Sequence, residues 1–139
     1  MATIGIPNLS TELEVALSAG MAEVEDLLRS HIEGNYPLVI ETSRHLVTAG
    51  GKRLRPAFCF WGFVGAGGDP TDELVIDAGA ALELLHAFAL FHDDVMDGSL
   101  TRRGEPTTNA KFEASHGANK LAGESRRFGD GVAILVGDL

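Results

Sequence analysis

The 139-residue chain has the length of a single domain, with 45% apolar and 22% charged residues, a balance typical of a globular core and not of disorder. Its formal net charge of −9 disfavours nucleic acid and anionic membranes as partners. A single cysteine, Cys59, excludes a disulfide within the chain and favours a cytoplasmic location. We expect no signal peptide, because the start is not basic, and no membrane span, because no charge-free apolar run approaches about 18 residues.

Apolar residues recur at helical spacing, which predicts an all-α fold. After a loose arm at 1–9, Thr11 and Glu14 form a capping box that opens the first helix. Asp69-Pro70-Thr71-Asp72 is expected to begin the fourth helix, with a cap and a proline at the first helical position. A loop is expected over 117–130. The predicted helices cover 11–32, 36–48, 56–64 (bulky on all sides, hence interior), 74–90 extended by an acidic end, 109–116 and 131–139.

Three aspartates, Asp93, Asp94 and Asp97, end the fourth helix. Carboxylates are disfavoured at the negative end of a helix dipole, so a cation is expected beside them. Asp93 and Asp97 project from one helix face, and magnesium (Mg2+) prefers carboxylate and phosphate oxygens, whereas Asp94 lies about 100° away and is expected to support the other two. Acidic helix ends are often plain solvated surface. Here the preceding apolar residues cover nearly the whole circumference, which predicts a buried helix that ends at a pocket.

Two groups of basic residues could supply the complementary charge. Arg102 and Arg103 follow the aspartates, and guanidinium groups bind phosphate bidentately. The stretch 50–56 reads G-G-K-R-L-R-P and places Lys52 and Arg55 on a loop and a first helical turn, where backbone N–H groups also favour an anion. A basic loop alone usually faces solvent. Together with D-D-x-x-D in an acidic chain, it indicates a diphosphate site.

Four blocks of the sequence resemble the trans-isoprenyl diphosphate synthases (polyprenyl synthetases), in matching order and approximate spacing. They are G-G-K-R-L-R-P at 50–56, L-L-H at 84–86, H-D-D-V-M-D-G-S-L-T-R-R-G-E-P-T-T at 92–108 and G-D-G-V-A-I-L-V-G-D-L at 129–139. The resemblance implies a homodimeric, isoprenoid synthase-type helical bundle around a central diphosphate-binding cavity. Residues 1–139 would be the N-terminal half of that domain, because the family's second aspartate-rich motif is not found after Asp97.

The resemblance also implies a reaction, in which isopentenyl diphosphate is condensed with dimethylallyl, geranyl or farnesyl diphosphate. Magnesium would be held by Asp93 and Asp97 with Asp94 in the same metal group, and the catalytic residues would be Asp93, Asp97, Lys52 and Arg102. Arg102 would bind the allylic diphosphate, and the isopentenyl diphosphate site would comprise Lys52, Arg55, His86 and Arg103. Arg53 is expected at the surface or in a dimer contact. No role is expected for His31, His45, His92 or His116.

Product length is expected to depend on residues just before Asp93. Phe88 lies five positions and Ala89 four positions before it, and this pattern resembles that of geranylgeranyl (C20) synthases. Alternatively, Phe88 is core packing, and Leu85 or residues of the second half set the chain length. A farnesyl or longer-chain synthase and a non-catalytic subunit of a heteromeric synthase also stay open. A class I terpene cyclase would not need the basic loop, and a purely structural helical module would not need the acidic cluster.

Overall fold

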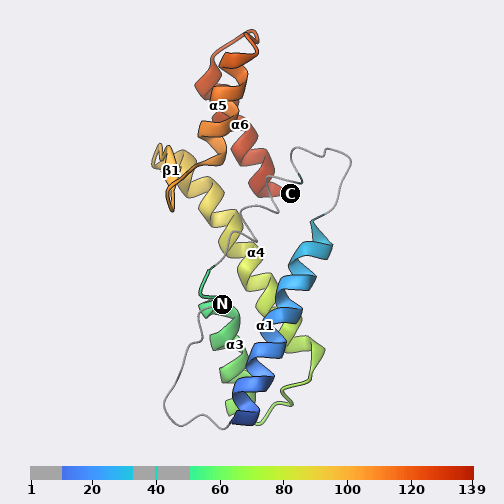
Figure 1. The fold of residues 1–139 in the computed structure, drawn as a ribbon. Coiled ribbons are helices and arrows are strands. Elements are labelled where there is room, and N and C mark those ends of the chain that lie inside the picture. The colour runs from blue at the N-terminus through green and yellow to red at the C-terminus, as the bar shows by residue number, and fades with distance from the viewer. Residues whose placement is uncertain (1–10, 33–39, 41–50) are drawn as a thin grey trace. The chain divides into compact units, whose positions relative to one another are not determined.

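The computed structural model describes residues 11–32, 40 and 51–139, and the helix expected over 36–48 lies outside these ranges. The described residues are mainly helical, which confirms the all-α prediction (Figure 1). A hairpin of two strands, each two residues long, follows the acidic cluster, and the sequence did not predict it. The elements are α1 (Thr11–His31), α3 (Leu54–Gly65), α4 (Glu73–Met96), β1 (Thr101–Arg102), β2 (Glu105–Pro106), α5 (Thr108–Ala118) and α6 (Ser125–Asp138).

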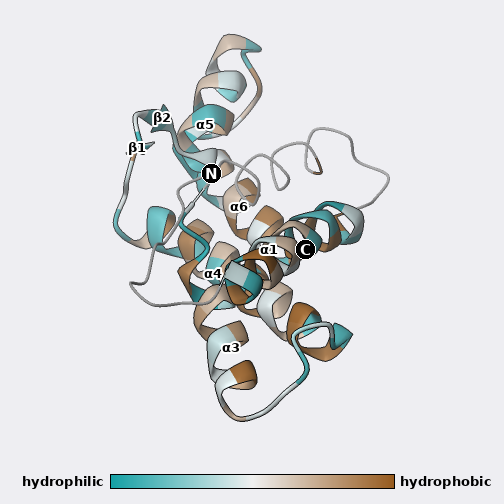
Figure 2. Cartoon of the chain, turned by 60° about the horizontal axis from the view of Figure 1, so that its bottom comes forward, coloured by the Kyte–Doolittle hydropathy of each residue, from teal (hydrophilic) through white to brown (hydrophobic). Residues whose placement is uncertain are grey.

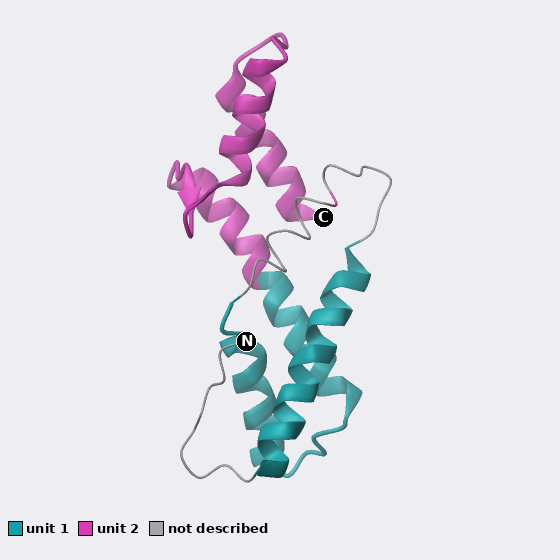
Figure 3. Cartoon of the chain, in the orientation of Figure 1, with its two compact units in different colours: residues 1–34, 44–85 teal, residues 35–43, 86–139 magenta. Residues whose placement is uncertain are grey.

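The chain divides into two compact units (Figure 3), and each is described by itself. Unit 1 comprises residues 1–34 and 44–85, and within it the described elements are α1, α3 and the first part of α4. Unit 2 comprises residues 35–43 and 86–139, and it holds the end of α4, the hairpin, α5 and α6. The basic loop therefore belongs to unit 1, and the acidic cluster belongs to unit 2.

Unit 1 has a core in which α1, α3 and α4 pack at close range. A Cβ atom on Gly20 of α1 would lie 3.1 Å from Cδ1 of Ile76 and 3.3 Å from Cε2 of Phe60. A Cβ atom on Gly79 of α4 would lie 2.9 Å from Cβ of Pro56. Two glycines thus allow these helices to approach each other more closely than larger residues would. Figure 2 shows apolar and polar residues interleaved along α1, as an amphipathic core helix requires.

The start of α4 differs from the expected arrangement. The helix begins at Glu73, and Asp72 caps it by accepting a hydrogen bond of 2.9 Å from the backbone N–H of Leu74. Asp69 instead accepts bonds from the backbone N–H (2.9 Å) and the hydroxyl (2.7 Å) of Thr71, and the backbone bond, the larger effect, lowers the pKa of Asp69. Pro70 therefore lies in a turn before the helix and not at its first position.

Burial of α4 was expected on most sides, and this prediction is wrong for the described residues. One stripe is buried, whereas several large side chains are exposed, among them Leu85 at 64% and Phe88 at 42%. The stripe carries mainly small or short side chains, because α4 packs closely on its neighbours. Its members are Val75, Ile76, Gly79, Ala80, Glu83, Ala87, Phe91 and Asp94.

By length and composition, α4 is long and apolar enough to cross a membrane, and it is the one such helix among the described residues. The core helix of a soluble protein meets the same criterion. Glu83, in the middle of α4, pairs with Arg53 of the same unit, as in a protein core. The absence of a membrane span stays a prediction.

The interior position expected for the third helix is also wrong in part. The helix extends over Leu54–Gly65, and Phe60 is 1% exposed, whereas Phe58 is 64% exposed. The ring of Phe58 lies edge to face on that of Trp61, one turn later in the same helix, with 5.5 Å between ring centroids. Aromatic residues on every side of a short helix therefore did not predict burial on every side.

In unit 2, α5 and α6 form an antiparallel pair (Figure 1). The loop expected over 117–130 is shorter than predicted, since α6 already begins at Ser125. His116, only 3% exposed, joins the two helices: its Nε2 lies 3.3 Å from the carbonyl oxygen of Ala122, and its Nδ1 lies 2.9 Å from Oγ of Ser125. Its ring also packs on Phe128, with 4.8 Å between centroids. This contact gives His116 a structural role.

Two glycines of α6 provide a test of this packing. A Cβ atom on Gly129 would collide with the backbone carbonyl oxygen of Asn109 and lie 3.0 Å from the backbone nitrogen of Glu113, whereas one on Gly131 would meet nothing within 4 Å. We expect Gly129→Ala to lower the free energy of unfolding by about 1–3 kcal/mol. Gly131→Ala should raise it by up to about 1 kcal/mol through helix propensity. Urea unfolding would measure both changes, and equal effects would contradict the close approach of α5 and α6.

Candidate functional site

The acidic cluster occupies the last turn of α4, where a glycine ends the helix. Gly98 has a φ of +62°, which glycine adopts without a steric penalty. The N–H of Ser99 donates to the carbonyl of Asp94 (2.9 Å), and that of Gly98 donates to Val95 (3.2 Å), the two bonds of a Schellman motif. The helix remains regular up to Asp97, whose N–H donates to Asp93 at 2.8 Å. Asp93 and Asp97 therefore lie one turn apart, and both are exposed.

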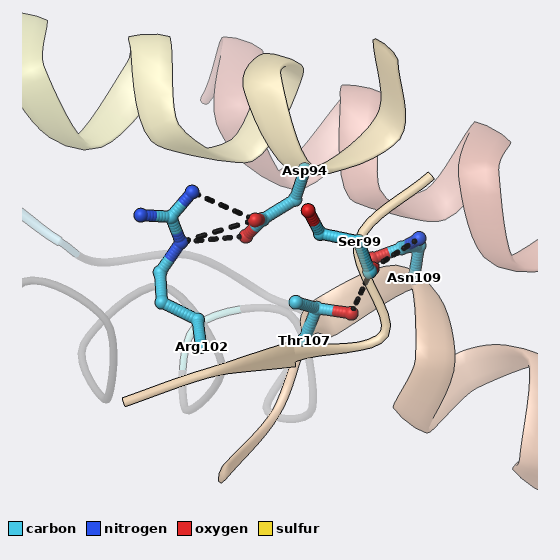
Figure 4. Close-up of polar contacts among 5 residues, drawn as sticks. All are labelled: Asp94, Ser99, Arg102, Thr107 and Asn109. Carbon is cyan, nitrogen blue, oxygen red and sulfur yellow. Dashed lines mark hydrogen bonds and ion pairs between the residues drawn. The ribbon is translucent and has the colours of Figure 1, made fainter. Parts of the chain in front are cut away.

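Asp94 points in a different direction and is only 4% exposed. Both of its carboxylate oxygens contact the guanidinium of Arg102 (Figure 4). Nε of Arg102 donates to Oδ1 at 3.0 Å and to Oδ2 at 3.1 Å, and Nη2 donates to Oδ1 at 2.8 Å. The hydrogen bond to Asp94 is the largest of the effects that raise the pKa of Arg102, against a smaller opposing effect of burial. This geometry is a bidentate, charge-assisted pair.

The hairpin holds Arg102 in place for this contact. Arg102 on β1 pairs with Glu105 on β2, and the two residues between them, Arg103 (φ +54°) and Gly104 (φ +86°), both have positive φ. Positive φ at both central positions is typical of the tight hairpin turns whose twist matches that of the strands. Arg103 stands at the exposed tip of the turn.

Thr107 and Asn109 fix the segment between the aspartates and the hairpin (Figure 4). Oγ1 of Thr107 donates to the carbonyl of Ser99 at 2.8 Å, and Nδ2 of Asn109 donates to the same oxygen at 3.3 Å. The two side chains are 3% and 4% exposed. Sequence reasoning assigned neither of them a role. The signal was their position, since short polar residues after a tight turn commonly bond to nearby backbone.

The donor set fits magnesium, although no group of three His, Cys, Asp or Glu side chains converges on one point in the part of the chain that the structure describes. Magnesium is usually bound through one or two carboxylates, with waters and phosphate oxygens completing its octahedron. Asp93 and Asp97 offer two exposed carboxylates one turn apart. Both oxygens of Asp94 are engaged by Arg102, so Asp94 supports the site in this arrangement and is not placed as a ligand.

The basic loop has a different internal structure from the one expected. Lys52 and Arg55 are exposed, as an anion site requires, but Arg53 was wrongly placed at the surface or in a dimer contact. The side chain of Arg53 is 12% exposed, and its Nη1 lies 2.8 Å from Oε2 of Glu83. Its Nε lies 3.5 Å from Oε1 of Glu25. Glu83 is the only glutamate within the apolar run of α4, and this position in the sequence could have indicated that a cation pairs with it.

The remaining predicted residues lie along α4. His86 is half-buried, whereas Leu85, Phe88 and Ala89 are exposed. The ring of Phe88 packs on that of His92, with 4.3 Å between centroids. Nδ1 of His92 lies 2.9 Å from the carbonyl oxygen of Phe88, and Nε2 lies 3.2 Å from Oδ1 of Asp138. These contacts make His92 a link between α4 and α6, consistent with no direct role in a site.

Comparison with known proteins places these features in a family. Residues 36–139 match the model of the polyprenyl synthetase family. The chain is 41% identical over 116 residues to a geranylgeranyl diphosphate synthase of Sulfolobus acidocaldarius, covering 84% of this chain and 30% of that one. It is 37% identical over 123 residues to a nonaprenyl diphosphate synthase of Mycobacterium tuberculosis, covering 88% and 32%.

A solved structure gives the same result. The crystal structure of geranylgeranyl pyrophosphate synthase from Corynebacterium glutamicum, complexed with isoprenyl diphosphate and magnesium, superposes with a TM-score of 0.67 at 36% identity, over 94% of this chain and 38% of that one. The chain spans about a third of the length of these relatives. With a family match over most of its length and the acidic and basic motifs in the expected order, the chain belongs to the polyprenyl synthetase family.

Proposed function

We propose that this chain carries the diphosphate-binding part of a magnesium-dependent prenyl diphosphate synthase, which condenses isopentenyl diphosphate with an allylic diphosphate. The observation that carries the proposal is that the three aspartates of the acidic motif differ in exposure and in contacts. Asp93 and Asp97 are exposed one turn apart, whereas Asp94 is buried and holds Arg102 beside them. An acidic surface patch without a function would not need a buried aspartate to orient an arginine.

In the proposed reaction, Asp93 and Asp97 would hold magnesium, and the bound ion would supply positive charge to the diphosphate group that leaves the allylic substrate. Arg102 binds the same diphosphate through the part of its guanidinium that Asp94 does not engage. Lys52, Arg55, His86 and Arg103 bind isopentenyl diphosphate, whose double bond attacks the allylic cation. The released diphosphate then takes up a proton from the condensed cation, which yields a chain longer by five carbons. The fixed cations stabilise charge that develops on the leaving group, so no protein nucleophile is needed.

Geranylgeranyl diphosphate is our proposed product. Support comes from Phe88 and Ala89 and from the identity with geranylgeranyl diphosphate synthases, although relatives named for nonaprenyl and heptaprenyl products are also similar. We infer a homodimer and a cytoplasmic location as well, from the family resemblance and the single cysteine. A subunit of a heteromeric synthase is the second candidate. It is favoured by 39% identity over 90 residues to a protein named heptaprenyl diphosphate synthase component 2 from Bacillus subtilis.

A prenyl-transfer assay tests the proposal directly. With magnesium, labelled isopentenyl diphosphate and dimethylallyl, geranyl or farnesyl diphosphate offered separately, we expect an elongated product of 20 carbons. Uptake of isopentenyl diphosphate would also exclude a terpene cyclase. A folded chain that forms no product with any of the three would contradict catalysis by this chain alone, and it would mean that the second half of the domain is required or that the chain is a subunit.

The three aspartates should respond differently to the same substitution. Asp93→Asn and Asp97→Asn should abolish magnesium-dependent binding of geranyl diphosphate, measured by titration calorimetry, and leave the melting temperature unchanged because both residues are exposed. Asp94→Asn leaves a partly buried arginine without its counter-charge and should lower the free energy of unfolding by about 1–3 kcal/mol. The idea fails if Asp94→Asn is as stable as the unsubstituted chain.

The role of Phe88 in product length can be tested by substitution. The side chain is 42% exposed, so Phe88→Ala should leave the fold intact while it extends the space open to a growing hydrocarbon. We expect products longer than 20 carbons by chromatography of the hydrolysed prenols. Leu74→Ala, at a position that is 70% exposed near the start of the same helix, is the control and should leave the product unchanged. An unchanged product from Phe88→Ala would show that other residues limit the chain.

A further inference from the structure

The basic loop contains one residue whose backbone is in an unusual conformation. Arg53 is the N-cap of α3 and has φ +47° and ψ +38°, in the left-handed region. Non-glycine residues rarely adopt this region, and they keep it only where the surroundings determine it. Arg53 lies between Lys52 and Arg55, the two exposed cations of the loop. Its backbone torsions therefore set the direction in which Lys52 leaves the helix end.

The side chain of Arg53 is held by two carboxylates from two other helices of unit 1. Glu83 of α4 lies 2.8 Å from Nη1, and its side chain is 9% exposed. Glu25 of α1 lies 3.5 Å from Nε and is 42% exposed. Glu83 is therefore the buried, short-range partner, and Glu25 is the outer one. A charge-assisted contact of this length, away from water, restricts the arginine far more than a surface pair does.

The same helix end is attached to α4 at a second point. Pro56, in the first turn of α3, packs against Gly79, where a Cβ atom would lie 2.9 Å from Cβ and 3.5 Å from Cα of the proline. Gly79 and Glu83 are one helical turn apart on the buried stripe of α4. The start of α3 is thus fixed by a close backbone contact and by an ion pair, side by side. Lys52 and Arg55 take no part in either attachment.

We propose that Glu83 is a positioning residue for the diphosphate site of the basic loop. By holding Arg53, it keeps the backbone left-handed and orients Lys52 and Arg55 toward a diphosphate group. Glu83 itself does not touch the ligand. The inference rests on the proposed function, since it takes the loop to be a diphosphate site. It also assigns Arg53 a supporting role and leaves ligand binding to its two exposed neighbours.

Positioning and plain electrostatics predict opposite signs for one substitution. Removing a negative charge near an anion site should tighten anion binding, whereas loss of a positioning contact should weaken it. We expect Glu83→Gln to weaken binding of inorganic diphosphate about tenfold. Asp77→Asn, an exposed acid on the same helix, should leave binding unchanged or slightly tighter. Calorimetry on the 139-residue chain in magnesium-free buffer removes the binding that the aspartates make through a metal. The loss of affinity in Lys52→Gln and Arg55→Gln then measures the share that the loop contributes.

Hydrogen exchange provides a readout that needs no ligand. In Glu83→Gln the amide of Ala57, which donates to the carbonyl of Arg53 at 3.1 Å, should exchange about tenfold faster, whereas Asp77→Asn should not change it. Glu25→Gln removes the exposed partner only and should weaken diphosphate binding in the same direction by a smaller factor. If Glu83→Gln does not fold, Glu25→Gln tests whether the carboxylates that hold Arg53 are needed for diphosphate binding by the loop.

The outcomes separate the two hypotheses. If neither the unsubstituted chain nor the variants Lys52→Gln and Arg55→Gln bind inorganic diphosphate, the loop is not a diphosphate site. This result would also contradict the role of Glu83. Unsubstituted chain that binds, with equal or tighter binding by Glu83→Gln, would contradict only the role of Glu83. A loss of diphosphate affinity in Glu83→Gln that is no greater than in Asp77→Asn would contradict the role of Glu83 too. Weaker binding together with faster exchange at Ala57 would support it.

Discussion

The ion pair between Asp94 and Arg102 determines how the acidic motif is used. At 2.8 Å and with Asp94 only 4% exposed, it removes one carboxylate from a crowded helix end and brings in a cation. The remaining two aspartates stay exposed one turn apart at the negative end of α4, where they require a counter-ion. The hairpin, Thr107 and Asn109 all serve this arrangement, since they fix the segment that returns Arg102 to the helix.

A second ion pair repeats the same principle in unit 1. Glu83 holds Arg53 inside, and Lys52 and Arg55 on either side of it remain exposed. In both motifs a run of like charges is divided into one paired member with little exposure and neighbours that are exposed. A buried unpaired charge is strongly unfavourable, so each inner residue is bound to its partner, and the outer residues are left for a ligand. Removing one partner of such an ion pair should therefore change the orientation of the exposed neighbours more than it changes the charge that a ligand meets.

The exposed side chains of α4 have a related explanation. The buried stripe of α4 holds glycine, alanine and two acidic residues beside Val75, Ile76 and Phe91, and the close approach at Gly79 leaves no room for a larger side chain there. Leu85 and Phe88 are left on the outer side, 64% and 42% exposed. Burying such side chains is worth about 1.5–3 kcal/mol each, so an exposed apolar face has a strong tendency to meet other apolar groups. A prenyl chain is one group of this kind, and the proposed function places it there.

The amino-acid sequence by itself determined the helical fold, the positions of α1 and α5 within a residue or two, and the two charged motifs. These features depend on local periodicity, capping and spacing. Only the tertiary structure decided that Arg53 is turned toward Glu83 with its side chain 12% exposed, that Asp94 faces inward, that Phe58 faces outward and that one stripe of α4 forms the core. Neighbouring charges in a row look alike in sequence. Which of them is paired depends on the element that packs against it, and Glu83 lies 30 residues after Arg53.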